Sequence, residues 1–470
     1  MVSHGRSAIY TDAEIITRDN VVSILSDAMS SHAHNRSDIQ YLYDYYRGIQ
    51  PILNRKKTVR PEINNKIVVN RANEIVSFKS SYLIGEPVQY VQRGSDDYSE
   101  AINTLNEYVF SEDKASKDKE LADWFHICGV AYRMVLPDKQ SDEKDEAPFE
   151  IYTLDPRNTF VVKYSGLGNK VKMGVTYVTK SDGDVIYSVY TEDKYFEINS
   201  FNKIIKDEVN PLGAIPIIEY KANEAMLGAF EVVIDLLDAI NNTVSNRIDG
   251  IEQFIQALLM FKGVDVDDKT FEKIKELGGI KVPSDGDVKY LIQELDQTQT
   301  QIAIDDMYQT VRNIVGIPST ANGQTSDSSN NGAVIMRNGW FAAESRAKDT
   351  ETMFKRSEKE FLKVLIKITN TLRDMDLKLS AIDIRFTRRN YENIYQKAQV
   401  LALMLGLDDV HPKLAFEYCG MFVDPDVAYE MSKAYAKEAE KKSMAELEQF
   451  TQLQINESKK NELLAEEDVA

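Results

Sequence analysis

The sequence predicts an α+β protein that is mainly helical, and three observations lead to this prediction. Residues 226–261 carry apolar side chains at steps of three and four, which is the pattern of one face of a long helix. Between residues 130 and 220, short segments rich in β-branched and aromatic residues alternate with turn signals, which indicates an antiparallel sheet. Beyond residue 390 the periodicity is helical again.

The composition is that of a folded protein, and it excludes several function classes. The chain has 470 residues, 43% hydrophobic and 28% charged, enough for about two to four domains. Its net charge of −19 opposes tight nonspecific binding to nucleic acid. We find no secretory leader and no run of about eighteen apolar residues, so we expect a cytosolic protein without membrane spans. Cys128 and Cys419 are far apart in the sequence and are expected to be buried thiols.

The N-terminal part is expected to begin with a short helix and a linker. Asp12 is predicted to cap the helix that follows it, and residues 30–37 are predicted to be a polar linker. His32 and His34 have no third ligand nearby, which favours a solvated linker over a metal site. The four tyrosines within residues 41–46 favour packing in a helical core over stacking on nucleic-acid bases.

An α+β region follows. A helix, a strand and a longer helix are predicted at residues 68–83, 87–91 and 98–127. Seven strands are predicted at residues 130–136, 149–154, 159–164, 172–179, 185–190, 195–198 and 215–220. Gly166-x-Gly168 lacks the third glycine and the following helix of a nucleotide-binding fingerprint, so we predict a hairpin turn there. His126 has no recognisable nucleophile or carboxylate partner and is predicted to be a core or surface histidine.

Two helices then bracket a small insert. The helix over residues 226–261 would be about 50 Å long at 1.5 Å per residue, with Gly250 as a point where it can bend. The second helix, over 298–315, ends because Gly316 can adopt a left-handed conformation and Pro318 cannot continue a helix. The insert is predicted to contain a short helix and two strands, at residues 269–277, 280–282 and 288–291. Its first aspartates lack the glycine and glutamate of a calcium loop and are expected to start the short helix, namely Asp265, Asp267 and Asp268.

A polar loop and further helices complete the chain. Residues 319–331 contain a single alanine as apolar content, so a mobile loop is predicted. A third helix is predicted over 332–373, and a strand over 382–387 is expected to return to the sheet. The final helices are predicted at residues 394–405, 412–419 and 424–464. The charges of the last one favour a solvated helix over a coiled-coil partner surface.

Four segments carry a family resemblance. The first runs from Asn70-x-x-x-x-Ile75-Val76 to Ser81-Tyr82-Leu83-x-Gly85-x-Pro87-Val88, and the second is Leu154-Asp155-Pro156-Arg157-Asn158-Thr159-Phe160. The third is the helix 226–261 with Gly279-Ile280-Lys281-Val282-Pro283-x-Asp285-Gly286-Asp287-Val288 and Gly316-Ile317-Pro318. The fourth is Phe386-Thr387-Arg388-Arg389-Asn390, Leu401-x-x-Met404-Leu405-Gly406 and Val423-Asp424-Pro425. In this order, they resemble the portal proteins of tailed bacteriophages, especially of long non-contractile-tailed phages of Gram-positive hosts. Where the family has a proline shortly after position 390, this chain has Tyr391-Glu392, a difference confined to a local turn.

The resemblance implies an architecture and an assembly. A portal-like fold has a wing with an antiparallel sheet, a helical stem, a small α/β clip, a long helix and a helical crown. Here it would divide into wing 1–221, stem 222–262 and 298–316, clip 263–297, tunnel loop 317–331, long helix and wing strand 332–389, and crown 390–470. Portal subunits form a ring, typically of twelve, at one capsid vertex, and double-stranded DNA passes through it.

The resemblance also implies partners and site residues. The partners would be the large terminase subunit, the head-to-tail adaptor, and the major capsid and scaffolding proteins, in a virion particle assembled in the host cytoplasm. The DNA-facing loop residues would be Thr320, Asn322, Gln324, Ser326, Ser328 and Asn330. The clip residues that bind motor and adaptor would be Lys269, Lys273, Glu276, Lys281, Asp285, Asp287 and Lys289. The stem residues that pack against neighbouring subunits would be Phe230, Leu237, Val244, Ile251, Met307 and Val311.

The physical chemistry is compatible with a portal, and two alternatives compete with it. An isolated helix pair would leave an apolar patch exposed, which oligomerisation would cover. An acidic chain with amide and hydroxyl side chains in its axial loop would contact DNA weakly and without reading its sequence. An enzyme would need a phosphate loop or a metal cluster, and we find neither, so we expect no cofactor and no enzymatic activity; a partner would hydrolyse the ATP. A cytosolic helical oligomeric scaffold without a DNA channel stays open as the alternative.

Overall fold

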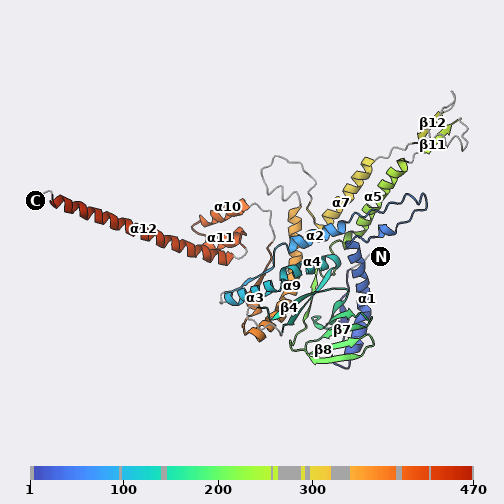
Figure 1. The fold of residues 1–470 in the computed structure, drawn as a ribbon, viewed down its shortest axis with the longest axis horizontal. Helices are drawn as coiled ribbons and strands as arrows, with labels where there is room; N and C mark the ends of the chain where they lie inside the picture. Colours follow the sequence, from blue (N-terminus) through green and yellow to red (C-terminus); the bar gives the residue numbers. More distant parts are fainter. Residues whose placement is uncertain are drawn as a thin grey trace. The chain divides into compact units, whose positions relative to one another are not determined.

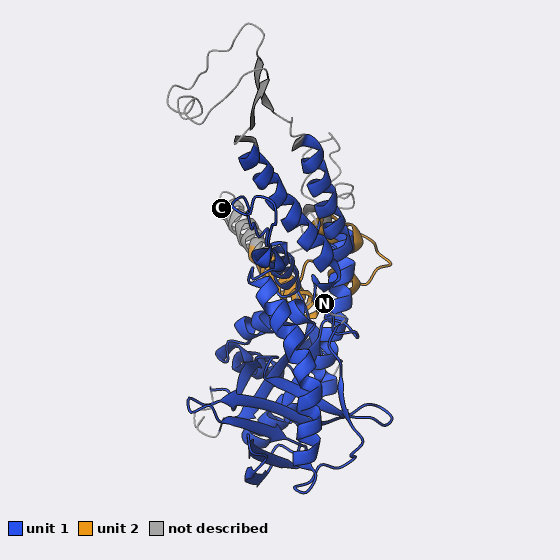
Figure 2. Cartoon of the chain, turned by 90° about the vertical axis from the view of Figure 1, so that its right-hand side faces the viewer, with its two compact units in different colours: residues 1–388 blue, residues 389–470 orange. Residues whose placement is uncertain are grey.

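The computed structural model describes residues 5–94, 98–138, 146–255, 258–262, 287–291, 297–318, 339–387, 394–422 and 425–467. The chain divides into two compact units, residues 1–388 and 389–470, coloured separately in Figure 2. Over these described ranges, no helix is long and apolar enough to cross a membrane. Nor do the described side chains include a cluster of three or more His, Cys, Asp or Glu that could hold a metal ion.

The N-terminal segment differs from its prediction. Asp12 does not cap a helix, because Ile9–Thr11 form strand β1 and helix α1 (Val21–Tyr46) begins later. The predicted linker 30–37 lies inside α1, because His32 occupies a buried position on the apolar face of the helix. The His32 ring stacks on Phe160, with centroids 4.5 Å apart, and burial lowers its pKa to about 4. The tyrosines pack as predicted: Tyr45 is fully buried and stacks on Phe230.

Helices and short 3₁₀ turns cover the sheets of the first unit. After the 3₁₀ turn η1 (Pro51–Asn54), helix α2 (Arg71–Leu83) begins at Asn70, whose side chain accepts a hydrogen bond from the Asn73 backbone N–H. The single helix predicted over 98–127 is instead two helices, α3 (Ser99–Ser111) and α4 (Lys114–Cys128). The chain turns between them at Asp113, whose φ of 48° lies in the left-handed region and interrupts the helix.

The strands form separate sheets instead of the single antiparallel sheet that the sequence predicts. One sheet has the order β1-β5-β6-β7-β8-β9 and is antiparallel except for the parallel pair β1–β5; a second has the order β10-β3-β4. Strand β13 does not join either sheet and pairs with β2, with Ile384 opposite Tyr90. The predicted hairpin turn at Gly166-x-Gly168 is confirmed between β5 and β6, but β1 and β9 were not predicted. Beside β1, the strands are β2 (Gln89–Gln92), β3 (Val130–Pro137), β4 (Phe149–Leu154), β5 (Thr159–Tyr164), β6 (Val171–Thr179), β7 (Val185–Tyr190), β8 (Lys194–Asn199), β9 (Ile204–Val209), β10 (Ile217–Lys221) and β13 (Ile382–Arg385).

The long helices are shorter than the periodicity predicts. The 3₁₀ turn η2 (Glu231–Val233) leads into α5 (Ile234–Ile255), which is about 33 Å long at 1.5 Å per residue. Residues 258–261, predicted as the end of this helix, belong to strand β11 (Leu258–Lys262), which pairs with β12 (Asp287–Leu291). Helix α7 (Gln297–Val315) confirms the second predicted helix, and Gly316 after it has a φ of 74°. Helix α9 (Trp340–Arg373) confirms most of the third, whose residues 332–338 lie outside the described ranges, and the 3₁₀ turn η3 (Leu379–Ala381) follows it.

The second unit consists of helices α10 (Ile394–Leu405), α11 (Pro412–Cys419) and α12 (Pro425–Glu467), close to the predicted bounds. Phe416 stacks on Phe422 within it, with ring centroids 5.2 Å apart. Cys419 here and Cys128 in the first unit are both buried free thiols, which confirms their prediction.

A buried ionic cluster joins α9 to the sheet region of the first unit. Lys114 lies 2.6 Å from Asp118 and 2.8 Å from Glu358, while Arg133 contacts both carboxylates. The hydroxyls of Tyr90 and Tyr220 donate to Glu358. Burial acts to raise the pKa of Glu358, but the adjacent Lys114 and Arg133 cations outweigh it and hold this pKa below its usual value. The two cations and two anions thus compensate one another away from water.

We expect Arg133→Met to destabilise the first unit by about 3–5 kcal/mol, because it leaves two buried carboxylates with a single cation. Urea unfolding followed by the fluorescence of Trp124 and Trp340, the two tryptophans of the chain, would measure the change. The control is Lys363→Met, which removes an exposed ion pair to Glu360 and should cost no more than about 1 kcal/mol. Equal effects of the two substitutions would contradict the compensation argument.

Candidate functional site at the stem helices

Helices α5 and α7 lie side by side and project from the body of the first unit, as Figure 1 and Figure 2 both show. We call them the stem pair. Their bases pack into a core that also includes α1, α2 and the start of β3. Phe230, Leu237 and Val311 are fully buried in this core. Their apolar surface is already covered within one chain, which leaves little of it for the predicted contacts with neighbouring subunits.

Other apolar side chains of the stem pair are still accessible. Val244 and Met307 are partly buried and pack against the same core. Ile251, from the predicted set, is 36% exposed. Two exposed residues of α7 were not in that set: Ile302 is 62% exposed and Ile314 is 40% exposed. The surface available to a neighbour is thus smaller than the sequence indicates and lies at different positions.

Most of the predicted clip and loop residues lie outside the described ranges. These are Lys269, Lys273, Glu276, Lys281, Asp285, Thr320, Asn322, Gln324, Ser326, Ser328 and Asn330. Asp287 and Lys289 lie on β12, where they pair with Lys262 and Met260 of β11. The strand predicted over 288–291 is thus confirmed, but its partner is the segment after α5. The strand predicted over 280–282 and the short helix over 269–277 are outside the described ranges.

A segment that the sequence did not single out fixes the position of α5. Residues 55–69, which we call the strap, form a loop beside this helix that turns back at residues 60–63 (Figure 1). The strap backbone donates to a row of buried polar side chains spaced four residues apart on α5. Val69 N–H donates to Asn241 at 2.8 Å, Ile67 N–H to Ser245 at 3.0 Å, and Asn65 N–H to Asp249 at 2.7 Å.

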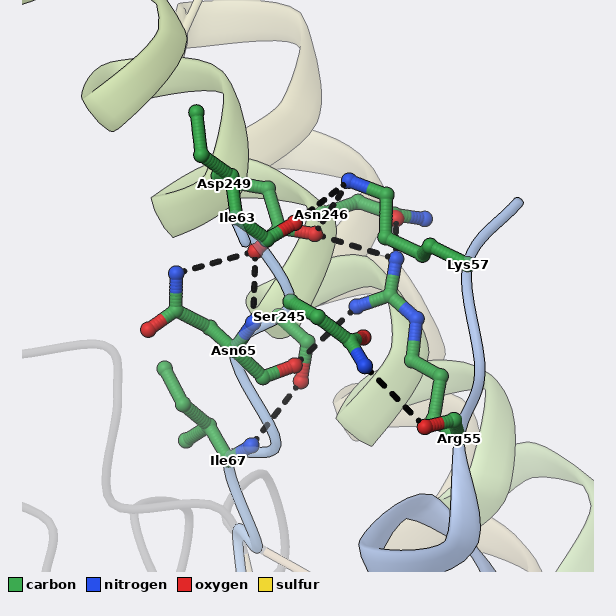
Figure 3. A network of polar contacts seen from close by, with 9 residues as sticks. Arg55, Lys57, Ile63, Asn65, Ile67, Ser245, Asn246 and Asp249 are labelled. Atoms are coloured by element: carbon green, nitrogen blue, oxygen red, sulfur yellow. Dashed lines mark hydrogen bonds and ion pairs between the residues drawn. The ribbon is translucent and has the colours of Figure 1, made fainter. Parts of the chain in front are cut away.

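Asp249 is the centre of this network, and Figure 3 shows the strap side chains that converge on it. Lys57 Nζ lies 2.9 Å and Arg55 3.2 Å from Asp249 Oδ2, while the Asn65 amide donates to Oδ1 at 2.9 Å. Burial acts to raise the pKa of Asp249, but the hydrogen bonds from Asn65 and Lys57 outweigh it, so this pKa is lowered. The carboxylate is therefore charged at neutral pH and holds the strap against the helix.

The sequence did carry a signal for the strap. Asn241, Ser245 and Asp249 interrupt the apolar pattern of α5 at intervals of four, so they share one side of the helix. All three are buried, and buried polar groups need partners. The sequence could indicate that a partner was needed, but not that residues 55–69 would supply it.

The opposite side of α5 faces α7. Arg247 donates to Gln301 of α7, whereas Asp249, two residues later and about 200° around the helix, binds the strap. Helix α2 contacts α7 through Tyr308. The Arg71 guanidinium of α2 lies 3.8 Å from the centre of the Tyr308 ring, and the Tyr308 hydroxyl donates to Glu74 of α2. Strap, α5 and α7 thus form consecutive layers.

The histidine of the helical core has a structural environment. His126 Nδ1 lies 3.1 Å from Ser80 Oγ, and both residues are buried. Burial, assisted by the nearby Lys79, lowers the pKa of His126 to about 3. Of the two environments predicted for His126, core or surface, the structure shows the core, and the Ser80 hydroxyl is buried with it.

Comparisons with known proteins identify the family. The chain matches the family model described as phage portal protein, SPP1 Gp6-like, over residues 28–445. The portal protein of Bacillus phage SPP1 is 26% identical over 276 residues, 53% of this chain and 52% of that protein, so the match spans about half of this relative's length.

Two solved structures show weaker likeness. They are the neck of an empty GTA particle computed with C6 symmetry and the neck of a native GTA particle computed with C12 symmetry. The neck of the empty particle is 11% identical, with 74% of this chain and 90% of that chain covered and a TM-score of 0.41. The neck of the native particle is 12% identical, with 76% of this chain and 91% of that chain covered and a TM-score of 0.39. The family assignment rests instead on the family model, which matches most of the chain. This chain therefore belongs to the phage portal protein family of the SPP1 Gp6-like type.

Proposed function

We propose that this portal protein forms a closed ring, typically of twelve copies, at one capsid vertex, and that double-stranded DNA passes through the ring during packaging and ejection. The family match over residues 28–445 carries this proposal. The proposed phage has a long non-contractile tail and a Gram-positive host, as the sequence resemblance implies. The protein would be a virion component assembled in the host cytoplasm.

Each part of a portal subunit is proposed to correspond to particular elements of the structure. Helices α5 and α7 would be the stem, β11 and β12 part of the clip, the α+β body with β13 the wing, and residues 390–470 the crown. The clip would bind the large terminase subunit and later the head-to-tail adaptor, and the wing would meet capsid and scaffolding proteins. The chain would supply no catalysis, and the terminase would hydrolyse the ATP.

The exposed apolar side chains of the stem pair support assembly. Ile251, Ile302 and Ile314 lie on a helix pair whose inner surface is already occupied by the chain's own core. Covering such side chains against a second copy removes apolar surface from water at about 25 cal/mol per Å². In place of Phe230, Leu237 and Val311, we propose these three isoleucines as subunit contacts.

Ring formation is the decisive experiment. Twelve copies of a 53.4 kDa chain would weigh about 640 kDa by native mass spectrometry. We expect Ile302→Asp to reduce the ring fraction at least about tenfold, because a charge would be desolvated in the contact. Ile205→Asp, at a 54% exposed position of β9, is the matched control and should leave the mass unchanged. A wild-type chain that forms no ring beside its capsid partners would favour the helical oligomeric scaffold without a channel.

The loop of residues 317–331 is proposed to face DNA. Its amide and hydroxyl side chains would give weak contacts, whereas a lysine would add a phosphate contact in every subunit. We expect Gln324→Lys and Asn330→Lys each to slow packaging severalfold in a terminase-driven assay, more at low salt than at high salt. Serine substitutions at the same positions are the neutral controls. Unchanged packaging rate and packaged DNA length in both lysine variants would contradict a DNA-facing loop.

The strap is proposed to keep the stem at a fixed orientation, and Asp249 makes this testable. Because the native pKa of Asp249 is lowered, its contribution is present above the unfolded value of about 3.9 and is lost as pH falls through the native pKa. We expect Asp249→Asn to cost about 1–3 kcal/mol at pH 7. The difference from wild type should shrink as the pH falls below about 4. Urea unfolding at both pH values measures it, and a difference independent of pH would contradict this role of the charge.

A further inference from the structure

The strap carries an unusual concentration of positive charge for this chain. Residues 55–69 contain five Lys or Arg and a single acid, Glu62, although the whole chain has a net charge of −19. Arg55 and Lys57 are bound to Asp249. The remaining cations are Lys56, Arg60 and Lys66, whose side chains make no hydrogen bond or ion pair with any described residue. Lys56 and Lys66 are exposed and Arg60 is partly buried, so the outer side of the strap is positively charged.

Two exposed side chains of α7, Asp305 and Asp306, have the opposite charge. Gln301, which accepts from Arg247, marks the side of α7 that faces α5. Asp306 is five residues later, about 140° around the helix, and therefore points away from α5. Asp305 is also exposed, but it lies only about 40° from Gln301, from which it accepts a hydrogen bond at 2.8 Å, so it is at the edge of α7 nearer to α5. The exposed Ile302 lies beside these carboxylates, as the exposed Val59 lies beside the strap cations.

The strap and α7 flank α5, and their charged side chains lie at a similar level along the stem. Strap and α7 contact sides of α5 about 200° apart, through Asp249 and Arg247 respectively. The bond between Arg247 and Gln301 sets these two residues at the same level along the stem. Asp305 and Asp306 follow Gln301 by one turn, and Asp249, which binds the strap, follows Arg247 by two residues. The acidic side chains of α7 and the strap cations are therefore within about two helical turns along the stem axis, roughly 11 Å. A long lysine or arginine side chain can span much of this distance.

We propose that Lys56, Arg60 and Lys66 of one copy dock on Asp305 and Asp306 of the next copy around the ring. This inference rests on the proposed ring assembly. Subunits in a ring meet through two different surfaces, one from each neighbour, so complementary patches on the two elements that flank α5 satisfy the geometry. Three cations without neighbouring aromatic side chains would bind nucleic acid only weakly, which favours the acidic surface of a second copy over DNA.

Charge reversal tests the docking. The strap variant is K56E/R60E/K66E and the α7 variant is D305K/D306K. Each alone places like charges opposite one another, so we expect the concentration for half-maximal ring formation to rise at least about tenfold. Combining both sets in one chain, or mixing the two variant proteins, restores opposite charges and should restore the ring. Restoration also shows that the variants fold.

Matched controls reverse charges elsewhere in the wing. K170E/K180E/K203E changes the net charge as much as the strap variant, and E192K/D193K as much as the α7 variant, all at exposed positions. Both controls should form rings like wild type. Native mass spectrometry at several protein concentrations gives the ring fraction in every case.

Several outcomes would overturn the proposal. Normal rings from both single-patch variants would reject the docking while leaving the proposed portal ring intact. Normal rings from the strap variant together with reduced retention of double-stranded DNA on filters would assign the strap to nucleic acid instead. Failure of the combined variant and of the mixture to recover rings would show that the patches do not face each other. A wild-type protein that forms no ring would overturn the proposed function itself.

Discussion

The contact between the strap and the buried polar row of α5 is the interaction on which the stem depends. Asn241, Ser245 and Asp249 are placed on a side of the helix that no apolar core could accept without a large desolvation cost. Backbone N–H groups of an extended segment satisfy them, and Arg55 and Lys57 balance the charge. This one arrangement commits one side of α5 to the strap, leaves the other side for α7, and turns the remaining strap cations outward.

The base of the stem is fixed by a second interaction of the same kind. Arg6 near the N-terminus forms a buried ion pair of 2.6 Å with Glu231, which also accepts from the backbone N–H of Gly228 at 2.8 Å. Gly129, just before β3, has a φ of 81°, and a Cβ there would lie 1.9 Å from the Met226 carbonyl oxygen. The segment that leads into the stem therefore packs so closely against residue 129 that only glycine fits there. The start of β3 and the segment that leads into α5 are therefore in direct backbone contact.

These contacts also explain how far sequence reasoning could reach. Helix α7 was predicted within one residue because Gly316 ends it with a left-handed residue, which is a local signal. The end of α5 was missed because residues 258–261 form an unbroken apolar run, which fits a strand as well as a helix. The strap could not be predicted, because its partners on α5 are 172 to 184 residues away in the sequence. The burial of Phe230 within its own chain could not be predicted, because periodicity does not distinguish a chain's own core from a neighbour.

The net negative charge of the subunit opposes its assembly with further copies of itself. In the proposed ring, copies that each carry −19 would repel one another, and burial of the proposed isoleucine contacts would have to overcome that repulsion. Most of the apolar surface of the stem is already used inside the chain, as the burial of Leu237 and Val311 shows. In the proposed docking, local charge complementarity at the contact would supply attraction where the net charge opposes it. The overall acidity would then keep the proposed channel from holding DNA, while the concentrated cations of the strap would serve assembly.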